Sequence, residues 1–428
     1  MVSRALAISL LVVGLALLLP RAVHGEPLSL EECIEMALSN NPYLMGYRAE
    51  WKASKPMKWE AFSGFLPQVY LENSLERRAT EMVSPYYHQY SEVVVTYNLF
   101  SGGETLNTYR EATHQIGAAE ERYRQATVDT AYRVSNAFYT LLEAREMVKA
   151  ARADLKDAET NLELAQARFK QGLAPYADVI KAKAGVANAR YKLTQREKEY
   201  YVAQGELNTE IGRPVMEKTE VAGGLGNETE EIPSDFEELA REGLSNNPYL
   251  KEVYQRLEAE RSKKRAVYSE FLPSLDFSWY YGWHDTSFPA NDYKEWEWML
   301  TLKIPLFSGF ASRARLAREK ALVESLEEQL EWERRTVTQE VWKAFQELKA
   351  TKANVDQSRA FLESAQEDMR ITQGRYKEGL ANMVDLITSQ ASLSLARAKH
   401  ISSIASFKRA LVALEKAMGK VPVLERRR

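Results

Sequence analysis

Two long stretches of this sequence carry the same heptad pattern, in which a large apolar residue alternates with a small one. The first runs from Val134 to Phe169 and returns from Val179 to Leu207. The second copy lies 207 residues further on, from Val341 to Tyr376, so that Leu141 of the first copy corresponds to Leu348 of the second. Small residues along such a seam let helix axes approach closely. We therefore expect two long helical hairpins that pack along their whole length.

The repetition extends beyond these helices. Phe65-Leu-Pro67 returns as Phe271-Leu-Pro273, an offset of 271 − 65 = 206, and Leu99-Phe-Ser-Gly102 returns as Leu306-Phe-Ser-Gly309, an offset of 306 − 99 = 207. One unit is therefore used twice, with one extra residue between these two markers. The expected organisation is a signal peptide at 1–25, a first repeat at 26–212, a linker at 213–234, a second repeat at 235–420 and a basic tail at 421–428.

The first residues have the features of a secretory signal peptide. Arg4 precedes an apolar run from Ala5 to Leu19, and Val23 and Gly25 suggest cleavage before Glu26. The run is too short to span a bilayer as a helix. The sequence therefore predicts an exported protein.

Composition excludes several classes of function. Loss of the signal peptide removes Arg4 and Arg21, so 57 − 2 = 55 basic residues face 60 acidic ones, a net charge of −5, and we expect no nucleic-acid partner. The single Cys33 cannot form an intrachain disulfide, and we expect it in the core. A catalytic triad and a phosphate-binding loop are absent from the sequence, so we expect no enzyme and no cofactor. Four histidines are scattered without the paired spacing of a metal site: His88, His114, His284 and His400.

Two segments, at about 67–100 and 273–306, change to a period of two and predict β-hairpins with strands of about ten residues. In the second hairpin every odd position of 275–283 is apolar or aromatic. Strands with one apolar face rich in aromatic residues are typical of transmembrane sheets. The pattern of the first hairpin, taken alone, also fits a soluble β-hairpin whose aromatic residues pack on a core. We expect tip loops at 79–88 and 286–292, and a membrane aromatic belt made of Trp279, Trp283, Trp296 and Trp298.

A sheet of only four strands in lipid requires several copies of the chain to assemble. Four strands cannot close a barrel, and an open sheet edge is not tolerated in lipid, so copies of the chain must combine, two giving eight strands or three giving twelve. The helix expected from Gly103 to Lys170 would run to about 100 Å and has no apolar stretch that could lie in a membrane. A duct that crosses one membrane and projects far from it fits these dimensions.

The ordered, doubled set of markers resembles the TolC family of outer membrane efflux proteins. The features that carry the resemblance are the two FLP turns, the two LFSG turns, and Gly172-Leu173 and Gly379-Leu380 followed by Asp178 and Asp385. They cover essentially the whole mature chain. The resemblance implies an α+β, mainly α, fold, in which long coiled-coil hairpins form a trimeric α-barrel and four transmembrane strands per chain contribute to a shared 12-stranded β-barrel. It also implies a homotrimer in outer membrane lipid that projects into the periplasm, docks to a periplasmic adaptor (membrane fusion protein) and an inner membrane transporter, and passively exports drugs, solvents, metals or polypeptides.

The resemblance also assigns roles at the hairpin tips. It implies a periplasmic gate at Asp178, Asp385 and Tyr376, and adaptor contacts at Gly172, Leu173, Gly379 and Leu380. From the residues alone, each aspartate could equally cap the returning helix, and each glycine could simply permit a left-handed turn. The chain departs from the family pattern at Ala381, where well-known members have arginine, and at Thr388, where they have a second aspartate.

Two other classes remain open at this point. A secreted structural coiled-coil or adhesin-like stalk would use the aromatic hairpin to bind a partner rather than lipid. A soluble adaptor also has a long hairpin, but only one, flanked by lipoyl-like β segments, and neither the duplication nor the aromatic strands suit it.

Overall fold

The structure is a computed structural model that describes residues 27–80, 83–226, 235–287 and 290–422. The predicted signal peptide, residues 227–234 of the predicted linker and most of the predicted tail lie outside the described residues. The first half contains α1 Leu30–Asn40, α2 Pro42–Ser54, α3 Met57–Ser63, β1 Gln68–Thr80, β2 Val83–Ser101, α4 Glu104–Lys170 and α5 Tyr176–Glu210. The second half contains α6 Phe236–Asn246, α7 Pro248–Tyr268, a short η1 Ser269–Phe271, β3 Ser274–Ser287, β4 Ala290–Lys303, α8 Ala311–Glu378 and α9 Met383–Ala417.

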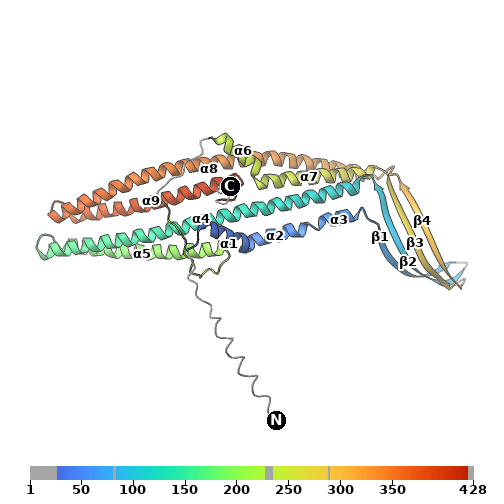
Figure 1. Cartoon of the computed structure of the whole chain (residues 1–428), viewed down its shortest axis with the longest axis horizontal. Helices are drawn as coiled ribbons and strands as arrows, with labels where there is room; N and C mark the ends of the chain where they lie inside the picture. Colours follow the sequence, from blue (N-terminus) through green and yellow to red (C-terminus); the bar gives the residue numbers. More distant parts are fainter. Residues whose placement is uncertain (1–26, 81–82, 227–234, 288–289, 423–428) are drawn as a thin grey trace, which may run out of the picture.

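The molecule is a long helical rod with a sheet at one end (Figure 1). The two hairpins, α4 with α5 and α8 with α9, point their turns away from the sheet, while α1–α3 and α6–α7 run beside the sheet-proximal halves of α4 and α8. The long helices α4 and α8 have 67 and 68 residues, as the sequence predicted. In the described part of the chain, we find no helix with both the length and the apolar character needed to cross a membrane.

Local sequence explains where the short helices begin. The sequence Ser29-Leu-Glu-Glu32 predicts a capping box at a helix start, and the structure confirms it, since Ser29 and Glu32 cap each other at the start of α1. Asn41 caps α2 with Pro42 at its first position, and Asp235 caps α6. These caps satisfy amides that the first helical turn leaves free.

The predicted seams are buried along most of their length. Leu141 and Leu348 are both fully buried where the hairpins meet the short helices, and Cys33 lies in the same cluster with 0% exposure. At the far end the two seams differ, because Tyr376 is 1% exposed whereas its counterpart Phe169 is 42% exposed. The described part of the predicted linker is packed, since Val221 pairs with Leu28 and is buried.

The four strands form one antiparallel sheet in the order β1-β2-β3-β4. Its strands have 13, 19, 14 and 14 residues, so the predicted length of about ten was too short. The predicted tip loops at 79–88 and 286–292 are also wrong, because strand pairing continues through most of both. Backbone hydrogen bonds need no apolar side chains, so polar ends of strands stay paired without an alternating pattern. The last described pairs are Thr80 with Val83 and Ser287 with Ala290.

Glycines turn the chain from the sheet into the long helices. Gly102 and Gly103 have φ of 64° and 90° before α4, and Gly309 has φ of 63° before α8. These left-handed angles favour glycine because it has no Cβ. Phe310 also has a positive φ, 65°, and is the one described residue other than glycine that does.

Candidate functional site

The two hairpin tips share one geometry. Gly172 and Gly379 have φ of 72° and 84°, which confirms the left-handed turns. The amides of Leu173 and Leu380 then donate back to carbonyl oxygens near the end of the preceding helix, at 2.9 and 2.8 Å. These turns leave both leucine side chains outside, 62% and 65% exposed. The tips therefore present two apolar side chains at the end of the rod that is far from the sheet.

Tyr376 joins the two hairpins just behind the tips. Its hydroxyl donates to Asp178 Oδ2 at 3.3 Å, and the Arg168 guanidinium carbon lies 4.7 Å from the centre of its ring. Burial, with the nearby Asp178 carboxylate, raises the pKa of Tyr376 to about 12. The tyrosine therefore stays protonated at physiological pH and can act as the donor.

Asp178 and Asp385 occupy equivalent sequence positions but make different contacts. Asp385 Oδ2 accepts the amide of Asn382 at 3.1 Å, and Asn382 Oδ1 accepts the amide of Asp385 at 3.0 Å, a complete capping box. Helix α5 instead begins after Pro175 and has no side-chain cap, so Asp178 is left to face Tyr376. The capping alternative is thus observed for Asp385 and not for Asp178.

A row of polar contacts between α4 and α9 continues away from the tips. Arg397 binds Asp154 at 2.6 Å and Asp157 at 2.9 Å, and Ser394 donates to Asp154 at 2.5 Å. Sequence patterns did not predict these contacts. One signal in the sequence was Asn161, an amide beside Leu162 of the α4 seam. It is 3% exposed and donates to Gln390 at 2.8 Å. Nearer the middle of the rod the row includes Glu143, which binds Ser402 at 2.6 Å and Arg409 at 2.7 Å.

At the other end of the molecule, the sheet has one apolar face. Register places Val69, Val95, Trp279 and Trp298 in one row, and Leu71, Val93, Tyr281 and Trp296 in the next. Trp283 lies on the same face opposite Lys294. Three of the four predicted belt residues are exposed, Trp283 at 51%, Trp296 at 65% and Trp298 at 60%, and Trp279 is half-buried.

The opposite face is polar, and it corrects the view that the histidines are scattered. The His88 and His284 rings are stacked, with their centres 5.5 Å apart and His284 Nδ1 3.3 Å from His88 Nε2, because β2 and β3 are paired. His284 Nε2 lies 2.8 Å from Glu92, whose side chain passes over Gly282. In the described residues, no group of three or more His, Cys, Asp or Glu side chains is placed to hold a metal ion.

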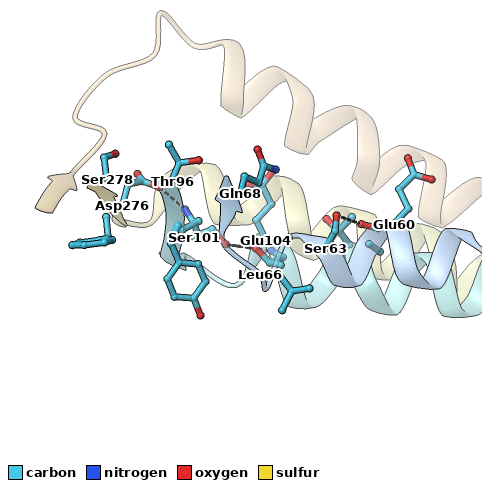
Figure 2. A pocket seen from close by; sticks show the side chains of 16 residues that line it. Glu60, Ser63, Leu66, Gln68, Thr96, Ser101, Glu104, Asp276 and Ser278 are labelled. Carbon is cyan, nitrogen blue, oxygen red and sulfur yellow. Dashed lines mark hydrogen bonds between the residues drawn. The ribbon is translucent and has the colours of Figure 1, made fainter. Parts of the chain in front are cut away.

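A polar pocket of about 610 Å³ lies where this face meets α3 and α4 (Figure 2). Carboxylates of Glu60, Glu104 and Asp276 line it, and Asn98 donates to Asp276 at 2.7 Å. Its lining is mainly polar, with the side chains of Gln68, Thr96 and Ser278 on the sheet side.

Comparison with known proteins decides between the remaining classes. A model of the family described as outer membrane efflux protein matches residues 33–213 and 239–420. The chain belongs to this family. The outer membrane efflux protein family consists of transport channels rather than enzymes, so the secreted stalk and the soluble adaptor are not supported.

Relatives of this efflux protein span most of its length. Protein CyaE of Bordetella pertussis is 26% identical over 94% of this chain and 86% of its own length. The toluene efflux pump outer membrane protein TtgC of Pseudomonas putida is 22% identical over 77% of this chain and 69% of its own. The alkaline protease secretion protein AprF of Pseudomonas aeruginosa is 21% identical over 86% of this chain and 79% of its own.

Solved structures share the fold. The outer-membrane channel OprN superposes with a TM-score of 0.82 at 19% identity, covering 91% of this chain and 89% of that one. VceC from Vibrio cholerae superposes with a TM-score of 0.79 at 18% identity, covering 91% and 96%. The efflux protein therefore has the fold of a trimeric channel with a helical barrel and a β-barrel. Its family and its relatives place it in the outer membrane, from which it projects into the periplasm.

Proposed function

We propose that this outer membrane efflux protein is a homotrimer that exports its cargo passively, without enzymatic activity. The open edges of β1 and β4 support assembly of several copies, because each copy contributes four strands and an uncovered edge in lipid would leave backbone groups unpaired. The fold shared with trimeric channels supports three copies rather than two. Three copies give twelve strands. The tryptophans on the apolar face, Trp279, Trp283, Trp296 and Trp298, would form the aromatic belt against lipid.

The two repeats would act as equivalent units in this assembly, at 26–212 and 235–420, after removal of a signal peptide at 1–25. The same order of elements in both halves supports this division. The linker at 213–234 would connect the units, and the tail at 421–428 would follow the second.

Closure of the periplasmic end is the second part of the proposal. The observation that carries it is the Tyr376–Asp178 hydrogen bond, which joins the two hairpins beside their tips. Breaking this contact, and the Arg397–Asp154 contact behind it, would free the hairpin of α8 and α9 to move relative to the hairpin of α4 and α5. Asp178 and Asp385 would also place carboxylates around a constriction in the trimer and attract cations.

The tips would dock the partners. We infer that Gly172, Leu173, Gly379 and Leu380 contact a periplasmic adaptor that links the channel to an inner membrane transporter. Exposure of both leucines at the end of the rod supports this role, because isolated apolar side chains on a turn can insert into a partner groove. The cargo would be small molecules or polypeptides, since one relative is named for toluene efflux and another for protease secretion.

Reconstitution tests the proposed channel. Protein purified from outer membranes in detergent should run as a heat-modifiable trimer and give single-channel currents in a planar bilayer. A stable monomer that remains in solution without detergent and gives no currents would refute the proposal.

A further inference from the structure

The residues of the two edge strands, β1 and β4, indicate in which register neighbouring copies pair. In the first hairpin Leu71 pairs with Val93, and the sequence offsets of 206 and 207 convert these into Phe277 and Leu300. Phe277 does pair with Leu300 in the second hairpin. The offsets therefore transfer register correctly from one repeat to the other.

The same operation can be applied to the seam between repeats. Within one copy, β2 of the first repeat pairs with β3 of the second, with Val93 opposite Tyr281 and Thr96 opposite Ser278. Adding 207 to the β2 residues and subtracting 206 from the β3 residues gives Leu300 opposite Leu75 and Lys303 opposite Glu72. These residues lie on β4 and β1, the two strands that have no second neighbour in the sheet. We propose that β4 of one copy pairs with β1 of the next in this register, an inference that rests on the proposed homotrimer.

The faces of the two strands match in this register. Leu300 and Leu75 both lie on the tryptophan face and are 52% and 66% exposed in the single copy. A slip of one residue would place apolar side chains of one strand beside polar side chains of the other, because successive residues point to opposite faces. A slip of two residues would keep the faces but move Lys303 away from Glu72.

Charge favours this register over a slip of two residues, which would place Lys303 opposite Tyr70 or Ser74. Glu72 lies directly opposite Glu92 on β2, and like charges directly across two strands destabilise a sheet. Lys303 lies opposite the uncharged Ser274 on its own hairpin. The proposed register brings Lys303 beside Glu72 on its free side, where it offsets the repulsion from Glu92.

The turns below the strands give independent support. A Cβ on Gly102 would lie 2.8 Å from Leu272 Cβ and 2.9 Å from the carbonyl oxygen of Ser269, so first and second repeats touch there. A Cβ on Gly309, its equivalent, would meet nothing within 4 Å. The residues equivalent to Leu272 and Ser269 are Leu66 and Ser63, since 272 − 206 = 66 and 269 − 206 = 63.

Exposure agrees with this reading of the turns. Ser269, covered by the Gly102 turn, is 5% exposed, whereas Ser63 is exposed and Leu66 is 50% exposed. Phe307, in the turn that has no partner, is 76% exposed. Within one copy, the Gly102 turn packs against Ser269 and Leu272. The equivalent turn at Gly309 and the equivalent residues Ser63 and Leu66 lack this contact, and in a ring of copies they would make it with each other across the interface.

Cysteine crosslinking tests the register directly. In a Cys33→Ala background, which removes the one native thiol, Leu300→Cys combined with Leu75→Cys should give covalent trimers on oxidation, because directly opposed residues have Cβ atoms about 4.5–5.5 Å apart. The matched control combines Leu300→Cys with Leu71→Cys, four residues and about 13 Å away along the strand, and should give none. Trimers that crosslink in the control and not in the test pair would overturn the register and leave the trimer intact. Absence of trimers in the Cys33→Ala parent would instead refute the proposed function.

Charge exchange gives a second readout. Lys303→Glu alone and Glu72→Lys alone should each lower the temperature at which the trimer dissociates in detergent, and the double exchange should restore it. Equal, additive losses in the double variant would show that the two residues do not meet and would contradict the register.

Discussion

Replacement of Tyr376 by phenylalanine removes one hydroxyl and keeps the buried ring, so it tests the proposed gate contact alone. A hydrogen bond to a charged group contributes about 1.5–3 kcal/mol to stability. The 3.3 Å separation from Asp178 exceeds the usual O–H···O distance of about 2.7–2.8 Å, so we take about 1 kcal/mol for each copy. Three copies in the proposed trimer give about 3 kcal/mol, or roughly a 100-fold shift of the closed-to-open equilibrium toward the open state.

Single-channel recording in a planar bilayer measures this shift as open probability. Tyr191→Phe on α5 is the matched control, because Tyr191 is 65% exposed and lies outside the tip contacts. The pKa of about 12 also predicts that wild-type gating is unchanged up to about pH 10, the ordinary value, and loosens above it as the hydroxyl loses its proton. Unchanged open probability in Tyr376→Phe trimers would refute the role of this contact in closure.

Three further predictions concern other residues. Asp385→Asn should keep the helix cap but weaken the block of channel current by multivalent cations. Asp385→Ala should lose both the cap and the block, and loss of the cap should cost about 1 kcal/mol of helix stability. Unchanged cation block in both variants would leave only the capping role for Asp385. Leu380→Trp should abolish efflux in cells while trimers persist in the membrane. Met216→Trp is the control, because Met216 is 95% exposed. Loss of trimers in Leu380→Trp would show that the leucine has only a structural role. Glu319→Gln should lower the melting temperature in detergent, because Glu319 accepts hydrogen bonds from Glu260, whose raised pKa lets it keep its proton, and from Arg318 and Lys263. These contacts lower the pKa of Glu319 to about 2. This contribution is present above pH 4.5 and is lost as the pH falls toward 2, so the two proteins should converge there, and a constant difference would contradict the assignment.

Sequence patterns determined the parts of this protein that depend on neighbours along the chain. The heptad seam predicted helices that the structure places at Glu104–Lys170 and Ala311–Glu378, and the box from Ser29 to Glu32 predicted the start of α1. These features follow from local rules, since a helix repeats every 3.6 residues and a cap reaches only three residues ahead. The duplication could be read in the same way, because both copies keep the same markers in the same order.

Tertiary structure alone decided which distant side chains meet. Asp178 and Asp385 are equivalent in sequence, yet one faces Tyr376 on the other hairpin and the other caps its own helix. Likewise, 196 residues separate His88 from His284, and only the pairing of β2 with β3 brings their rings together. Periodicity reports which face of an element is apolar, but the partner on that face is set by how separate elements pack, and that depends on contacts that no local pattern encodes.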